Sequence, residues 1–336
     1  MTVLLASHES SLRHDSGPLH PERPARIEAV IRGVAAAGPA VVGVSPEEID
    51  RAHLTAVHDP AYVDSIEAFC RAGGGNLDLD THAGSDSWEA ALRAAGAGIE
   101  LSARLAAGDG DLGYVAMRPP GHHAVTNRAM GFCLFNNVAV TARYLVDAGA
   151  RVAVFDWDVH HGNGTQDLFY ADPRVLYVSI HESGIYPGTG GMSETGIGDA
   201  QGTNLNLAVP FGSNGWVHRA AIDELYGPAI RQFAPDWLLV SAGYDAHRFD
   251  PLAGLNLIGD DYGAMAASLA QCVPEQRSIV FLEGGYDLAA LEESAAATVR
   301  GWLRPDWRAA DPIGDGRDLD CLRRAKDVAA EYWNVG

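Results

Sequence analysis

The chain has 336 residues, of which 47% are hydrophobic and 20% are charged. This length and apolar content suit a globular protein with a large core and exclude a disordered or fibrous chain. Its 24 Lys and Arg against 44 Asp and Glu give a formal net charge of −20. Such a charge repels nucleic acid and anionic membranes, so we expect neither as a partner.

The cysteines and the start of the chain bear on the compartment. The four cysteines, at positions 70, 133, 272 and 321, are far apart and form no C-x-x-C motif. This spacing argues against a disulfide framework and favours a reducing compartment. The opening "MTVLLASHES" has no basic leader, and no stretch reaches the ~20 apolar residues of a membrane helix. We therefore expect a cytoplasmic protein.

Short apolar runs along the chain predict strands that are buried on both faces. They lie at 3–6, 114–117, 152–155, 175–180, 205–209, 237–242 and 279–282. Helical patterns alternate with them, at 22–37, 60–71, 86–107, 137–148, 215–233, 260–272, 287–302 and 319–332. This alternation predicts an α/β fold with a central, mostly parallel sheet and helices on both faces.

Two local patterns lead to further expectations. "SPEE" at 45–48 predicts a helix start with Ser45 as its N-cap and Pro46 in the first turn. "RAGGGN" at 71–76 predicts a loop within the fold, since nothing in the chain resembles a linker. We therefore expect a single domain over residues 1–336.

Four of the predicted strands lead directly into polar clusters. These clusters are "RPPGHHA", "DWDVHHGNG", "YDAH" and "EGGY", and their chemistry-bearing residues are His122, His123, Asp156, Asp158, His160, His161, Asp245 and Tyr286. In open parallel sheets, ligands bind outside the carboxyl ends of the strands. The four clusters are therefore expected to converge on one pocket.

Each cluster taken alone has a simpler explanation. A pair of adjacent histidines is more often a helix cap or a core feature than a catalytic pair, and Gly-Gly-Tyr is a common exit from a strand. The D-x-D-x-H pattern is more specific, because alternate side chains of an extended segment point the same way. Asp158 and His160 can therefore bind one ion. The combination of clusters carries the argument for an active site.

The motifs together resemble a known family. "HPERPARI", "RPPGHHA", "GFCLFNNVAV", "DWDVHHGNGTQ", "YPGTG", "SAGYDAH" and "LEGGYDL" are similar to motifs of the zinc-dependent histone deacetylase superfamily. That superfamily includes bacterial histone-deacetylase-like amidohydrolases and acetylpolyamine amidohydrolases. The similarity spans roughly residues 8 to 300 and is closer to the class II branch. It implies an arginase/deacetylase-like fold and hydrolysis of an acylated amine.

The resemblance implies a set of metal ligands. Asp158, His160 and Asp245 would bind one ion per chain, with zinc the usual metal of the superfamily. The oxygen-rich ligand set also accommodates iron(II). A structural potassium ion is implied nearby, held partly through backbone oxygens by Asp156, Asp158, His160, Ser179 and Ile180. His161 is expected to pack or to cap a helix and not to bind metal.

Proton transfer is assigned by the same resemblance. His123 would be the principal general base and acid, and His122 would tune the local charge. Each imidazole needs a partner on its other nitrogen, and we expect Asp156 for His122 and Asn163 for His123. The hydroxyl of Tyr286 would donate a hydrogen bond to the developing oxyanion.

The resemblance also implies residues that contact the substrate, although their spacing in the sequence is less distinctive than that of the metal ligands. Gly131, Phe132 and Tyr186 resemble the walls of an acyl-lysine tunnel, and Asp80 would grip the substrate at its rim. Leu252 stands where acetylpolyamine-selective relatives can carry a glutamate. A leucine offers no charge to an ammonium group, so we expect acyl-lysine peptides or proteins as substrates in preference to acylated polyamines.

Two other classes remain as alternatives. An arginase-like binuclear hydrolase would need D-x-H-x-D and a second D-x-D cluster, whereas "DVHHG" at 158–162 lacks the trailing aspartate. An inactive acyl-lysine binding module would have no need of Tyr286 or of both histidines, all of which are present. The sequence shows no heptad stripe and leaves the oligomeric state open.

Overall fold

The computed structural model describes residues 1–304, 306–309 and 314–335. At its centre is an eight-stranded sheet in the order β2-β1-β5-β10-β9-β6-β7-β8, and every neighbouring pair is parallel. The strands are β1 (Thr2–Ala6), β2 (Ala40–Val44), β5 (Leu112–Val115), β6 (Val152–Asp156), β7 (Val175–Glu182), β8 (Asn204–Val209), β9 (Trp237–Ala242) and β10 (Ser278–Leu282). The predicted α/β fold with a parallel sheet is confirmed.

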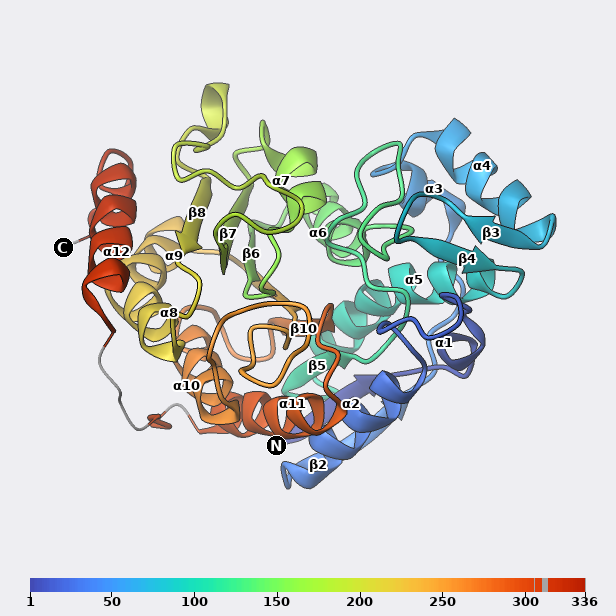
Figure 1. Ribbon diagram of the computed structural model, residues 1–336, viewed down its shortest axis with the longest axis horizontal. Helices are drawn as coiled ribbons and strands as arrows, with labels where there is room; N and C mark the ends of the chain where they lie inside the picture. Colours follow the sequence, from blue (N-terminus) through green and yellow to red (C-terminus); the bar gives the residue numbers. More distant parts are fainter. Residues whose placement is uncertain (305, 310–313, 336) are drawn as a thin grey trace.

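Helices cover both faces of this sheet, as Figure 1 shows, with α2, α10 and α11 on one side and α4 and α5 on the other. None of the helices within the described ranges is long and apolar enough to cross a lipid bilayer. The helices are α1 (Ser10–Arg13), α2 (Ala25–Ala36), α3 (Arg51–Thr55), α4 (Pro60–Arg71), α5 (Ser87–Ala106), α6 (Asn137–Asp147), α7 (Asn163–Phe169), α8 (Gly215–Ala221), a π-helical turn (Ile222–Tyr226), α9 (Gly227–Phe233), α10 (Gly259–Ala270), α11 (Leu288–Leu303) and α12 (Gly316–Ala329).

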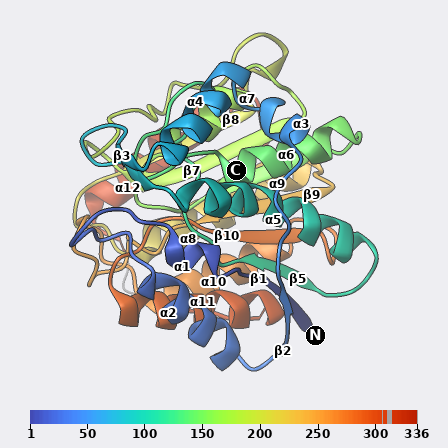
Figure 2. The ribbon, with the colours of Figure 1, turned by 90° about the vertical axis from the view of Figure 1, so that its right-hand side faces the viewer.

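The sheet separates two hydrophobic cores, which explains why its strands are continuously apolar. Along β1, Val3 and Leu5 belong to the core that includes residues of α2 and α11. Leu4 and Ala6 point the other way, into the core that includes residues of α5 and α6. Successive side chains of a strand alternate between faces, so a strand covered on both sides is apolar at every position. Figure 2 shows the sheet between these helical layers.

Two local predictions are wrong. Residues 45–48 are not helical; α3 begins only at Arg51, and its N-cap is Asp50, whose carboxylate accepts a hydrogen bond from the Ala52 N–H at 2.8 Å. The Ser-Pro-Glu-Glu signature is therefore present without a helix behind it. In the predicted loop 71–76, Gly74–Asn76 forms β3, which pairs antiparallel with β4 (His82–Gly84). Gly74 has φ +76°, and a Cβ there would overlap the Ala83 carbonyl, so close pairing requires glycine.

Candidate metal centre and active site

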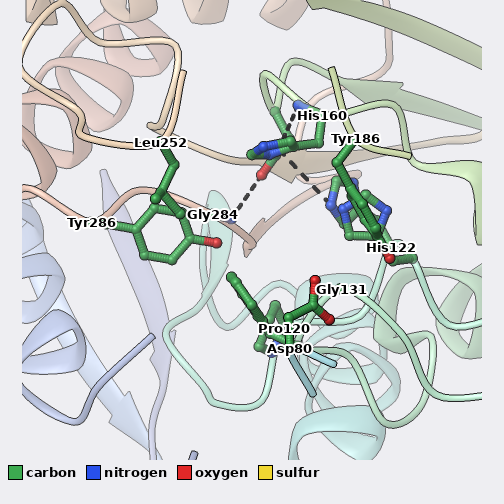
Figure 3. A pocket seen from close by; sticks show the side chains of 12 residues that line it. Asp80, Pro120, His122, Gly131, His160, Tyr186, Leu252, Gly284 and Tyr286 are labelled. Atoms are coloured by element: carbon green, nitrogen blue, oxygen red, sulfur yellow. Dashed lines mark hydrogen bonds and ion pairs between the residues drawn. The ribbon is translucent and has the colours of Figure 1, made fainter. Parts of the chain in front are cut away.

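The four polar clusters follow four strands that are neighbours in the sheet, namely β5, β10, β9 and β6. Because these strands are parallel, their carboxyl ends lie along one edge, and the clusters meet there. They surround a cavity of about 200 Å³, whose side chains are drawn in Figure 3. The cavity is lined by Asp80, Pro120, His122, His123, Gly131, Phe132, Asp158, His160, Tyr186, Leu252, Gly284 and Tyr286.

The three predicted metal ligands come together at this edge. Asp158, His160 and Asp245 each offer one ligand atom, and these atoms lie within 4.8 Å of one another. His160 Nδ1 is 3.2 Å from Asp158 Oδ1 and 3.1 Å from Asp245 Oδ2. Two buried carboxylates facing one imidazole form a donor set that fits a divalent cation such as zinc, with open positions for water or substrate.

Backbone N–H groups from neighbouring loops hold both carboxylates in place. Asp158 Oδ2 accepts a hydrogen bond from the Gly284 N–H at 2.7 Å, and Asp245 Oδ1 accepts one from the Val159 N–H at 2.9 Å. A Cβ at Gly284 would overlap Asp245 Oδ2 and lie 2.7 Å from Asp158 Oδ2. Only glycine therefore lets the loop after β10 approach these two carboxylates this closely.

The two adjacent histidines lie side by side next to the possible metal-binding residues Asp158, His160 and Asp245, called the metal group below. The ring centroids of His122 and His123 are 4.0 Å apart, and both side chains are buried. His122 Nδ1 lies 3.0 Å from Asp156 Oδ2, and His123 Nδ1 lies 2.9 Å from Asn163 Oδ1. Both expected partners are therefore in hydrogen-bonding position, and each leaves the Nε2 of its histidine for other contacts.

The environment of the pair gives the two imidazoles opposite tendencies. Burial lowers the pKa of His122, but the carboxylates of Asp156 and Asp158 outweigh it and raise the value to about 10. Burial, together with the positive charges of His122 and His160, lowers the pKa of His123 well below its ordinary value. These surroundings favour the protonated form of His122 and the neutral form of His123, which can accept a proton.

Tyr286 enters the cavity from the opposite side, and Figure 3 shows its hydroxyl pointing inward. Its ring packs edge-on against Phe132 at 5.9 Å between centroids, and the Arg26 guanidinium lies 5.0 Å from the ring centroid. Its backbone N–H donates to Asp250 Oδ2 at 2.6 Å. Burial raises the pKa of the Tyr286 phenol well above its ordinary value, so the hydroxyl stays protonated and can donate a hydrogen bond.

The expected wall and rim residues also border the cavity. Gly131 has φ +55°, and a Cβ there would overlap the His123 ring and lie 3.0 Å from Tyr186. A side chain at this position would therefore narrow the channel beside the histidines. Asp80 and Leu252, both exposed at the cavity's edge, stand at its mouth.

His161 is not part of the metal group. Its Nδ1 is 2.7 Å from Thr189 Oγ1 and its Nε2 is 3.0 Å from Gln166 Oε1. Its ring packs against His181 at 4.8 Å between centroids. Both ring nitrogens are therefore engaged behind the site, in agreement with the interpretation of His161 as a packing residue.

Sequence reasoning missed the buried charged residues that support the site. Glu22 forms ion pairs with Arg26 and Arg118, and Arg26 also donates to the backbone carbonyls of Glu283 and Gly285. The Glu283 carboxylate accepts hydrogen bonds from the backbone of the loop after β5 that carries His122 and His123, called the histidine loop below. All of these except Gly285 are charged residues within quoted motifs. Arg118 and Glu283 directly follow apolar strand runs, and a charged residue in that position is a signal that could have drawn attention to them.

A solved structure has the same fold as this chain. The crystal structure of the HDA15 HD domain superposes with a TM-score of 0.92 at 33% sequence identity, over 99% of this chain and 97% of that one. A 40% identical relative, an uncharacterized protein of Synechocystis, matches over 90% of this chain and its own full length.

Further relatives carry functional names. Histone deacetylase-like amidohydrolase of Pseudomonas aeruginosa is 36% identical over 83% of this chain and 77% of its own. Histone deacetylase 10, chloroplastic, of Oryza sativa is 43% identical over 74% of this chain, which spans 60% of the rice protein's length. The model of the histone deacetylase domain matches residues 20–302. The chain belongs to the histone deacetylase family.

Proposed function

We propose that the protein hydrolyses the amide of acylated lysine side chains, releasing acetate or another carboxylic acid. The observation that carries this proposal is the convergence of the metal group, the histidine pair and Tyr286 on one cavity. Membership of the histone deacetylase family supports the hydrolase class. We extend the catalytic unit to residues 1–336, because α12 packs against α8 and β8 of the same fold.

Asp158, His160 and Asp245 would hold the metal, for which we propose zinc, with iron(II) as the other candidate. Bound there, such an ion supplies Lewis acidity that polarises a carbonyl and makes water more acidic. We also propose potassium as a structural ion, held by Asp156 and Ser179 among others; Asp156, the last residue of β6, is paired with Ser179 of β7, and both are fully buried. The unpaired, buried cysteines of the chain suit a reducing compartment such as the cytoplasm.

The chain's own groups divide the remaining work. Neutral His123, oriented by Asn163, would take the proton from the attacking water and pass it to the leaving amine. His122, held by Asp156, would carry positive charge beside it. The Tyr286 hydroxyl would donate a hydrogen bond to the oxygen that becomes negative in the transition state.

The cavity favours a side chain with an apolar stem over a polycation. Phe132 and Tyr186 offer aromatic surfaces, and Leu252 at the mouth presents no charge to an ammonium group. Asp80 could accept hydrogen bonds from a peptide backbone at the rim. We therefore propose acyl-lysine peptides or proteins as substrates, in preference to acylated polyamines.

A substrate panel tests this proposal. Purified protein loaded with zinc or iron(II) is assayed on acetyl-lysine and longer acyl-lysine peptides and on N-acetylspermidine. We expect hydrolysis of the peptides, inhibition by a hydroxamate, and little polyamine turnover. A Leu252→Glu variant should shift the ratio toward the polyamine, with Leu252→Met as its control. A strong polyamine preference in the parent protein would refute the substrate, and inertness toward every acylated amine would refute the reaction.

A further inference from the structure

Glu283 is a buried carboxylate beside the active site that does not reach the cavity. It follows the last residue of β10 and has no exposed surface. Its Oε2 accepts hydrogen bonds from the backbone N–H groups of Gly121, at 2.7 Å, and of His122, at 3.1 Å. Its Oε1 lies 3.3 Å from Ser241 Oγ, on the adjacent strand β9. The carboxylate thus joins the end of the sheet to the loop that carries the histidine pair.

The backbone of Glu283 is itself fixed on both sides. Its N–H donates to the Ala242 carbonyl at 3.1 Å, and its own carbonyl accepts a hydrogen bond from the buried Arg26 guanidinium. The start of the histidine loop is held separately, because Arg118 forms a buried ion pair with Glu22. The Glu283 carboxylate therefore holds the second half of that loop against the sheet from the N–H side, while the Gly164 and Thr165 N–H groups donate to the His122 carbonyl on the other side.

A buried carboxylate at position 283 lowers the stability of the folded protein. Burying an anion costs several kcal/mol unless cations and hydrogen bonds compensate for the lost water. Within the described residues, no lysine or arginine forms an ion pair with the Glu283 side chain. Burial raises its pKa to about 7, because the charge of His122 and the Gly121 and His122 N–H groups offset only part of the cost of burial. A leucine or glutamine of similar size would fill the space at a smaller electrostatic cost. Groups kept against local stability are commonly functional.

We infer that Glu283 is a positioning residue for proton transfer: its carboxylate holds the Gly121 and His122 N–H groups so that the His122 and His123 rings face the metal group. This inference rests on the proposed hydrolase function. It adds to that function a residue that touches neither metal nor substrate and acts only through the loop before it.

Two variants at this position and one control test the inference. Glu283→Gln keeps the size and one oxygen acceptor, whereas Glu283→Leu removes both acceptors. Ser241→Ala removes the neighbouring hydroxyl without touching the histidine loop. Each protein is checked for thermal stability and metal content and then assayed on an acetyl-lysine peptide amide and on an aryl acetate ester, whose phenolate leaves without needing a proton.

We expect Glu283→Leu to lower kcat on the amide by roughly 100-fold, in the range of a lost acid–base contribution, with KM and metal content nearly unchanged. The loss on the ester should be at least about tenfold smaller, because one of the two proton transfers is no longer needed. Glu283→Gln should recover part of the activity, and Ser241→Ala should stay within about twofold of the parent.

Three outcomes would overturn the inference. Unchanged amide hydrolysis in both Glu283 variants would show that the carboxylate positions nothing of importance. Equal losses on amide and ester, together with lost metal or an unfolded Glu283→Gln protein, would reduce its role to stability. A parent protein that hydrolyses neither substrate would instead refute the proposed function, and the positioning role would fall with it.

Discussion

Replacing Tyr286 by phenylalanine isolates the proposed oxyanion contact. The ring is held by Phe132 and by the Arg26 guanidinium, and the backbone by Asp250. None of these three contacts involves the phenolic oxygen, so Tyr286→Phe should keep the loop and the ring in place. The substitution therefore removes one hydrogen-bond donor from the cavity and little else.

The expected loss follows from the setting of that donor. Tyr286 is only 8% exposed, and its hydroxyl faces the cavity that would take the substrate. Removing one oxyanion donor from a water-poor site typically costs about 3 kcal/mol of transition-state stabilisation, or roughly 100- to 1,000-fold in kcat. The raised pKa of Tyr286 keeps the hydroxyl protonated, so the ratio of parent to variant kcat should be flat from pH 6 to 9.

The assay is steady-state hydrolysis of an acetyl-lysine peptide by the metal-loaded parent and variant. Metal content and hydroxamate affinity serve as controls for an intact site. A loss in kcat with metal retained and KM nearly constant would agree with a contact made mainly in the transition state. A variant with more than about one fifth of the parent kcat would refute the oxyanion role.

Three further predictions concern the metal group and the pH dependence of stability. Asp245→Ala should abolish metal retention and activity together, and an alanine variant that still binds one equivalent of metal tightly would remove this residue from the ligand set. Gly284→Ala should give a folded protein with metal affinity at least about tenfold weaker, because the new Cβ displaces Asp245 and crowds Asp158; unaltered affinity by metal titration would contradict this. His58 has Nδ1 at 3.1 Å from a carbonyl and accepts the Asn136 N–H at 2.9 Å, and burial lowers its pKa to about 4. Below pH 6.5, His58 therefore becomes protonated in the unfolded chain but stays neutral in the folded protein until the pH approaches 4. The stability advantage of the parent over His58→Gln, measured by denaturant unfolding, should thus shrink by about 2 kcal/mol from pH 7 to pH 5, and a constant difference would show that this imidazole does not titrate as inferred.

Local patterns were sufficient where one physical rule dominated. The short, largely apolar runs predicted seven strands of the central sheet, because a strand covered on both faces has no side that must be polar. The edge strand Ala40–Val44 was missed; its first four residues are exposed, and Gly43 interrupts its short apolar run. Ser45 failed as a helix cap because a cap signature stabilises a helix that other contacts must form.

The site shows the same division. The sequence by itself determined which residue types were present, their spacing in Asp158 and His160, and the family to which the motifs point. Only the tertiary structure decided that β5, β10, β9 and β6 are neighbours, which brings Asp245 and Tyr286 to the same cavity.

The buried supports of the site belong wholly to the tertiary level. Glu22 and Glu283 are isolated charged residues in the sequence, and the residues next to them do not indicate which groups their side chains contact. The partners of their side chains lie as much as 162 positions away, as for the contact between Glu283 and Gly121. Pairings at such separations depend on how helices and strands pack around two cores, and a local pattern of residues carries no information about that packing.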